Sequence, residues 1–225
     1  MGIGSILEFY FYCGGESAQV WGTGFRDAAA IPDWMRVKID GLGKIRAVRG
    51  PATAKALGDM SNVPFGDPGV LAHALPRHPQ RRRAKVFLPH FRTWMSKAGR
   101  AELRAADRAG FSIVAPNTAP MSIIGAIEAA DLVVTSCLHG LIVGHSVGTA
   151  TQLVDIPSSG NDEPTFKYND YLDTVGLSLD RLSARDAFYT HTPSQLIDKL
   201  GPLVAPAQDA CSRMGDGLVA AVRGL

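Results

Sequence analysis

Short apolar runs alternate along this chain with longer stretches whose apolar residues recur every three or four positions. The short runs, typical of buried strands, lie at residues 19–25, 44–48, 86–88, 111–115, 132–135 and 151–156. The helical stretches lie at residues 52–57, 93–109, 120–130, 138–147 and from 193 onward. Strands that alternate with helices form right-handed βαβ units, so the pattern predicts an α/β fold with a parallel sheet.

Two interruptions of this alternation predict the domain boundaries. The first, at residues 76–84, is rich in proline and contains Arg81-Arg82-Arg83, and the second lies at residues 176–183, before the C-terminal helices. We therefore expect a short N-terminal lobe over residues 1–75, a basic linker over 76–84, a longer α/β lobe over 85–178 and a helical segment over 179–225.

Composition mainly excludes classes of protein. Hydrophobic residues make up 46% of the chain and charged residues 20%, which is typical of a folded globular protein. A net charge of +2 argues against nonspecific nucleic-acid binding. The three cysteines are far apart and form no zinc or disulfide pattern, which favours a reducing cytoplasm. No apolar run approaches the roughly 20 residues of a membrane helix, and the start of the chain lacks the basic region of a signal peptide.

The positive charge is concentrated in one stretch. Residues 77–108 contain ten lysines and arginines against Glu102 and Asp107, a local excess of +8. A solvated linker followed by a solvated helix face explains such a stretch. The alternative is an electrostatic patch that faces an anionic polysaccharide or the head groups at the inner face of a membrane.

One motif suggests a serine hydrolase. Gly144-His145-Ser146-Val147-Gly148 matches the nucleophile elbow G-x-S-x-G, which requires a strand before the serine and a helix after it. However, the apolar strand at residues 132–135 ends too close to this motif for the crossover that parallel strands need. We expect these small residues to pack a helix against its neighbour instead.

A second constellation lies where a strand gives way to a helix. Ser136-Cys137-Leu138-His139-Gly140 begins the predicted helix, where free backbone N–H groups and the helix dipole favour an anion. His139 and His145 are six residues apart and do not share a helix face, so a two-histidine metal site is not expected. Cys137 and His139 are two residues apart, and we expect their side chains to diverge, which argues against thiol catalysis.

Six short motifs follow one another along the chain. They are Val20-Trp21-Gly22-Thr23-Gly24-Phe25, Val48-Arg49-Gly50-Pro51, Gly66-Asp67-Pro68, Leu88-Pro89-His90, Ser136 to Gly140, and Phe166-Lys167-Tyr168-Asn169-Asp170-Tyr171. The set resembles the polysaccharide pyruvyl transferases, and its fourth and sixth motifs resemble the succinoglycan-type branch. The resemblance covers roughly residues 3–178. It implies two Rossmann-like lobes similar to the two-lobed glycosyltransferase (GT-B) fold, with residues 1–75 on the acceptor side and 85–178 on the donor side.

The chain departs from the family in two places. Cys137 stands where many members carry arginine and where the succinoglycan-type branch often carries serine, which puts one phosphate contact in doubt. Family chains usually begin with a further βα unit before the segment that matches residues 3–7, and this unit is missing here. We therefore expect a short N-terminal lobe and an acceptor side that is incomplete.

The resemblance implies transfer of pyruvate from phosphoenolpyruvate to two hydroxyls of a sugar, which forms a ketal on an exopolysaccharide or wall-polymer precursor. A phosphate and a carboxylate need fixed cations, and arginine suits both. The candidate acid–base residues are His139 and His90, because a histidine can exchange a proton near neutral pH. The candidate residues for binding phosphoenolpyruvate are Arg49, Ser136, Gly140, Arg92 and Lys167. We expect Arg49 and His139 to face one cleft, and Arg49→Ala to weaken binding while the fold stays intact.

The expected partners are phosphoenolpyruvate as co-substrate and a lipid-linked or polymeric saccharide acceptor, without a metal, a further cofactor or nucleic acid. Three alternatives stay open: a truncated, non-catalytic homologue, a nucleotide-sugar glycosyltransferase and a serine hydrolase. A glycosyltransferase needs an acidic residue after a late strand to hold a ribose, and Asp155 and Asp162-Glu163 stand in that region.

Overall fold

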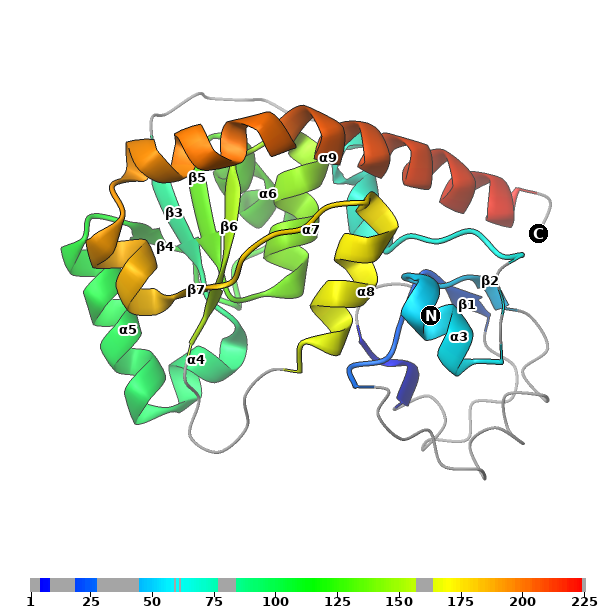
Figure 1. The fold of residues 1–225 in the computed structure, drawn as a ribbon, viewed down its shortest axis with the longest axis horizontal. Helices are drawn as coiled ribbons and strands as arrows, with labels where there is room; N and C mark the ends of the chain where they lie inside the picture. Colours follow the sequence, from blue (N-terminus) through cyan, green and yellow to red (C-terminus); the bar gives the residue numbers. More distant parts are fainter. Residues whose placement is uncertain are drawn as a thin grey trace. The chain divides into compact units, whose positions relative to one another are not determined.

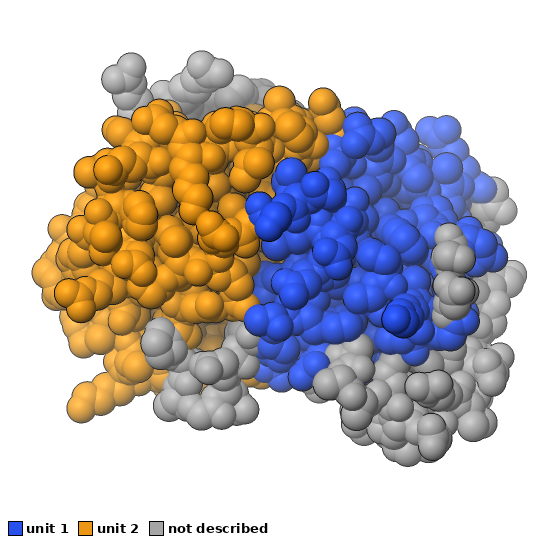
Figure 2. Space-filling view, in the orientation of Figure 1, with its two compact units in different colours: residues 1–71, 164–178, 210–225 blue, residues 72–163, 179–209 orange. Residues whose placement is uncertain are grey.

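The computed structural model describes residues 5–8, 19–27, 45–58, 60, 62–76, 84–156 and 164–223. Its chain divides into two compact units, coloured separately in Figure 2. Unit 1 comprises residues 1–71, 164–178 and 210–225, and unit 2 comprises residues 72–163 and 179–209. The division differs from the predicted lobes, because residues 164–178 and the end of the chain belong with the N-terminal segment. Most of the predicted basic linker lies outside the described residues.

Unit 2 is built on a five-stranded parallel sheet (Figure 1), which confirms the predicted α/β class. Its strands are β3 (Lys85–Leu88), β4 (Ser112–Ile113), β5 (Leu132–Thr135), β6 (Thr151–Asp155) and β7 (Leu182–Ser183), in the spatial order β4-β3-β5-β6-β7. When these strands are counted along the chain, the order is 2-1-3-4-5. The chain therefore builds outward from β3 in one direction and then, from β5 onward, in the other.

Helices cover both faces of this sheet (Figure 1). They are α4 (Phe91–Met95), α5 (Lys97–Arg108), α6 (Pro120–Glu128), α7 (Leu138–Val147) and the first part of α9 (Pro193–Val222). On one face, Phe87 and Val134 pack with α5, α9 and the π-helical turn η2 (Asp186–Thr190). On the other face, Val86 and Val133 pack with α6 and α7. The alternation of side chains along each buried strand fills both layers.

The helix predicted over residues 93–109 is interrupted at Ser96. This residue is extended, with φ −103° and ψ 152°, and its hydroxyl accepts a hydrogen bond of 2.8 Å from the backbone N–H of Gly99. Ser96 is thus the N-cap of α5, and a serine cap that satisfies a free N–H competes well with a continuous helix.

Unit 1 contains a two-stranded parallel sheet of β1 (Val20–Trp21) and β2 (Ile45–Ala47). The strand predicted over residues 19–25 is therefore much shorter than expected. Helices α3 (Pro51–Ala56) and α8 (Phe166–Val175) belong to this unit, as do the start of the 3₁₀ helix η1 (Pro68–Ala74) and the end of α9. Its core gathers apolar side chains from β1, from α3 and from other described segments of the unit, namely Leu7, Val20, Phe25, Val48, Ala54 and Leu57.

Among the described residues, no helix has both the length and the apolar composition required to cross a membrane.

Candidate active site

The carboxyl ends of β3 and β5 form the candidate site of unit 2. These neighbouring strands are where the strand order reverses, and ligands of open α/β sheets bind beside such a point. His90 follows β3, and residues 136–140 comprise the link from β5 and the first turn of α7, as the sequence predicted.

Two hydrogen bonds hold the β3 and β5 ends together. The backbone N–H of His90 donates to Oγ of Ser136 over 2.9 Å, and the hydroxyl of Thr135 donates to the carbonyl of Leu88 over 2.8 Å. Two predicted site residues, 46 positions apart in sequence, are therefore in direct contact. Ser136 is almost fully buried, and its hydroxyl positions the segment that carries His90.

The aromatic ring of Phe91 lies close to two of the candidate residues. The rings of His90 and Phe91 are 4.5 Å apart, and the guanidinium carbon of Arg92 lies 5.7 Å from the centre of the same phenyl ring. Phe91 begins α4, directly after the predicted acid–base residue. It was not predicted as part of the site, and no local motif marks it.

Gly140 is required by the close approach of α7 to the sheet. A Cβ atom at this position would lie 2.3 Å from Oγ1 of Thr135 and 2.8 Å from a methyl carbon of Leu88. No larger residue fits there without displacing the helix start. Gly140 therefore has a packing role beside its predicted role in binding substrate, which stays a prediction.

The first turn of α7 brings together a thiol and an imidazole, so the expectation that Cys137 and His139 diverge was wrong. The His139 side chain and the backbone N–H groups of His139 and Gly140 lie near the thiol of Cys137. Burial raises the pKa of this thiol, whereas the contacts with His139 and Gly140 lower it. The lowering is the larger effect, so the net pKa lies below its ordinary value. The turn thus stabilises negative charge, as expected at a helix N-terminus.

The G-x-S-x-G motif is not a nucleophile elbow. Ser146 lies in the last turn of α7 and is fully buried, and the helix ends at Gly148 in a left-handed conformation with φ 75°. Its hydroxyl accepts a hydrogen bond of 3.0 Å from the backbone N–H of His73, and Nδ1 of His73 lies 3.3 Å away. This serine connects α7 to η1, so the structure gives the hydrolase alternative no support.

Arg49, in unit 1, lies in the protein interior. Its side chain is fully buried and forms an ion pair with Asp170, with Nε 3.0 Å from Oδ2. The two terminal nitrogens donate to the carbonyl of Phe25 over 2.6 Å and to Oγ of Ser5 over 2.7 Å. Burial lowers the pKa of the guanidinium, and the carboxylate of Asp170 partly offsets this effect. The structure therefore does not support the expectation that Arg49→Ala leaves the fold intact.

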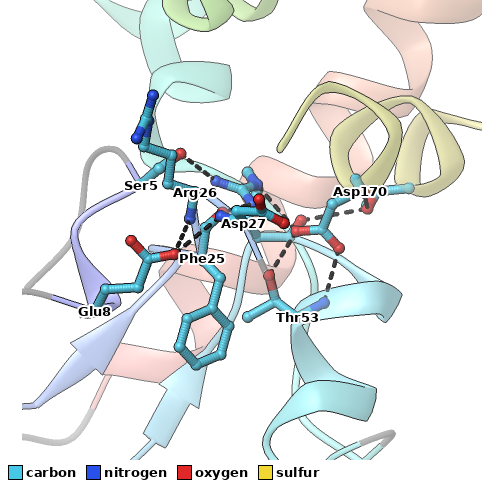
Figure 3. Close-up of polar contacts among 9 residues, drawn as sticks. Ser5, Glu8, Phe25, Arg26, Asp27, Thr53 and Asp170 are labelled. Atoms are coloured by element: carbon cyan, nitrogen blue, oxygen red, sulfur yellow. Dashed lines mark hydrogen bonds and ion pairs between the residues drawn. The ribbon is translucent and has the colours of Figure 1, made fainter. Parts of the chain in front are cut away.

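Asp170 is the centre of this network, as Figure 3 shows. Besides Arg49, it accepts hydrogen bonds from the backbone N–H of Thr53 over 3.0 Å and from the Thr53 hydroxyl over 2.6 Å. A Cβ atom on Gly50 would lie 2.1 Å from the carbonyl oxygen of Asp170, so this glycine allows α3 and α8 to meet. The sequence motif over residues 166–171 contained Asp170, but nothing local indicated its partner.

The predicted site residues are divided between the two units. Unit 2 places His90, Arg92, Ser136, His139 and Gly140 at one end of its sheet, whereas unit 1 holds Arg49 and Lys167. Lys167 lies in the first turn of α8, is 5% exposed and has its ammonium 5.0 Å from the ring of Tyr168. Whether any of these residues binds phosphoenolpyruvate stays a prediction.

One of the two further candidates can be placed. Asp155, at the end of β6, forms an ion pair with Arg181, while residues 162–163 lie outside the described part of the chain. Within the described residues, no group of three or more histidine, cysteine, aspartate or glutamate side chains is arranged to hold a metal ion.

No protein-family model matches the chain. The chain is 27% identical over 180 residues to the succinoglycan biosynthesis protein ExoV of Rhizobium meliloti (strain 1021). The match covers 79% of this chain and 54% of that protein, so the chain spans about half the length of the relative. This match confirms the resemblance to the succinoglycan-type branch, of which the chain is a distant relative.

Proposed function

We propose that this protein transfers pyruvate from phosphoenolpyruvate to a sugar of an exopolysaccharide precursor and forms a ketal. The observation that carries the proposal is the direct contact between the segments of His90 and Ser136 at the reversal of strand order. There, a helix N-terminus that favours negative charge lies next to two histidines. The distant relationship to a protein of succinoglycan biosynthesis supports this substrate class.

The reaction needs an anion site and a group that moves protons. The first turn of α7 would hold the phosphate or the carboxylate of phosphoenolpyruvate, and Arg92 supplies a cation on the neighbouring segment. His139 would protonate C3 of the enol, which makes C2 electrophilic, and one sugar hydroxyl would add to C2 while His90 takes its proton. The C2–O bond to phosphate then breaks, and a second hydroxyl adds to C2 and loses its proton, which closes the ketal.

The same proposal includes roles for Arg49 and Lys167 in this reaction. It also includes the two-lobed GT-B architecture, a cytoplasmic location and independence from any cofactor. The buried network of Arg49 restricts its contribution. With all three nitrogens engaged by Asp170, Phe25 and Ser5, it would act by positioning α8, the helix that carries Lys167.

The test is to incubate the protein with phosphoenolpyruvate and a lipid-linked acceptor that ends in galactose or glucose, and to measure released phosphate and the ketal product. His139→Gln keeps a similar size and hydrogen-bonding capacity but exchanges no proton near neutral pH. We expect kcat to fall by about 10²–10⁴, with a smaller change in the affinity for phosphoenolpyruvate.

His191→Gln is the matched control, because His191 lies at the end of η2, where its Nδ1 contacts the carbonyl of Asp186. This variant should turn over like the wild type. Wild-type turnover by a folded His139→Gln variant would remove His139 from catalysis. Release of a nucleotide from a nucleotide sugar, with no phosphate from phosphoenolpyruvate, would replace the proposal with the glycosyltransferase alternative.

A further inference from the structure

Helix α5 carries a stripe of exposed cations on one face. Lys97, Arg100, Arg104 and Arg108 follow one another at intervals of three, four and four residues, which places them on the same side of a helix. All four are exposed, whereas Leu103 on the other side of the helix is buried in the core of unit 2. At 1.5 Å per residue, the stripe is roughly 16 Å long.

Little negative charge opposes this stripe. Asp107 is the exposed carboxylate of α5 and borders the stripe, and Glu102 is half-buried. Within the described part of the chain, the ion pairs of the structure involve none of the four cations. Two of them have one neutral partner each: Arg100 donates to the carbonyl of Trp94 over 3.1 Å and Arg108 to the hydroxyl of Tyr189 over 3.5 Å.

Exposed apolar side chains lie at both ends of the stripe. Phe91 and Met95, one turn apart on α4, are 49% and 73% exposed, and Met95 lies two residues before the first cation. Tyr189, which contacts Arg108 at the other end, is 56% exposed. Cations flanked by exposed apolar and aromatic side chains are typical of surfaces that lie in the headgroup region of a bilayer.

We propose that this surface, formed by Phe91, Met95, the four cations of α5 and Tyr189, binds the surface of an anionic phospholipid bilayer. The cations contact lipid phosphates and carboxylates, and Phe91 and Met95 enter the boundary between head groups and acyl chains. An anionic polysaccharide fits less well, because a hydrated chain offers nothing to bury against Met95. The inference does not depend on the proposed reaction, although it would bring the segment of His90, the N-cap of α4, near lipid-linked substrates.

The test is sedimentation of the full chain with vesicles of phosphatidylcholine, with and without phosphatidylserine. Binding should require phosphatidylserine and weaken with salt. The double variant Lys97→Gln/Arg104→Gln removes two of the four cations and keeps Arg100 and Arg108, which have hydrogen-bond partners. At about fivefold per cation near an anionic surface, its affinity should fall by about 25-fold.

A matched control removes the same charge elsewhere. Lys199→Gln/Arg213→Gln neutralises two exposed cations of α9 and should bind vesicles like the wild type. Equal losses from both double variants would show a mere effect of net charge and overturn the proposal, as would equal binding to vesicles with and without phosphatidylserine.

Met95→Ser distinguishes a bilayer from a soluble polyanion. It should weaken vesicle binding about tenfold by removing an apolar side chain that inserts, and should leave binding to dextran sulfate unchanged. Unchanged vesicle binding by Met95→Ser, together with equal losses of vesicle and dextran sulfate binding by Lys97→Gln/Arg104→Gln, would establish a polyanion site instead. Thermal unfolding of each variant confirms that these exposed substitutions leave the fold intact.

Discussion

Removing the carboxylate of Asp170 should destabilise the protein strongly, because it leaves the charge of Arg49 inside the protein without its counter-charge. Both side chains are fully buried, and their ion pair is 3.0 Å long. Breaking a buried pair of this kind typically lowers the free energy of unfolding by about 3–5 kcal/mol. A typical domain has about 5–15 kcal/mol in total, so Asp170→Ala should lose a large part of its stability.

The structure also predicts how the two partners differ. After Arg49→Met, the carboxylate of Asp170 keeps its hydrogen bonds of 3.0 and 2.6 Å from Thr53. After Asp170→Ala, the guanidinium keeps only neutral partners. We therefore expect Asp170→Ala to destabilise more than Arg49→Met, and the double variant to cost less than the sum, with a coupling free energy of up to about 3 kcal/mol.

Urea unfolding of the wild type, the two single variants and the double variant measures this coupling. The control is Asp180→Ala, which breaks the exposed ion pair with Lys199, 3.1 Å long, and should cost less than about 1 kcal/mol. Additive effects, or an Arg49→Met variant that unfolds like the wild type but no longer binds phosphoenolpyruvate, would refute the structural role and support direct contact between Arg49 and the substrate.

Three further predictions concern unit 2 and the cysteines. Iodoacetamide should alkylate Cys137 at a lower pH than an ordinary thiol, since its pKa is lowered, and should spare Cys211, whose pKa burial raises to about 11; peptide mass spectrometry against pH tests this, and equal profiles would contradict it. Burial lowers the pKa of His145 to about 4, so the unfolded state takes up a proton first as the pH falls below about 6.5. The free energy of unfolding should then drop by about 2 kcal/mol between pH 7 and 5, and His145→Gln should abolish this part of the pH dependence in urea titrations. Gly140→Ala should destabilise by about 1–3 kcal/mol in thermal unfolding, whereas Gly125→Ala, with no atom within 4 Å of the new Cβ, should not; equal melting temperatures would count against the close approach of α7.

Sequence patterns located the elements of unit 2 well where local signals agree. The strand at residues 132–135 and the helix at 138–147 lie where predicted, because a continuous apolar run, a helix-compatible stretch and Gly148 follow one another without competing signals. The helix predicted over 93–109 was broken by a serine cap, which competes with helix continuation through a side-chain hydrogen bond that periodicity does not detect.

The site was predicted where topology alone determines proximity. The ends of adjacent parallel strands must meet, so His90 and Ser136 were correctly placed at one edge. The contact between Cys137 and His139 was missed because Cys137 is extended, with φ −106° and ψ 130°, and helical spacing does not apply to it. The pair of Arg49 and Asp170 was missed because 121 residues separate them, and neither has a local pattern that identifies the other.

This separation has a consequence for folding during synthesis. When Arg49 leaves the ribosome, the carboxylate that neutralises it has not been made, and at about 5–20 residues per second it follows roughly 6–24 seconds later. Unit 2 contains nearly all of its sheet in one continuous segment and can form before the chain is complete. The N-terminal segment cannot bury the charge of Arg49 until α8 has emerged, because the guanidinium stays in water until Asp170 is present. Nascent chains that stall before residue 170 should therefore keep this segment open to proteases and chaperones, even after strands β3 to β6 have paired.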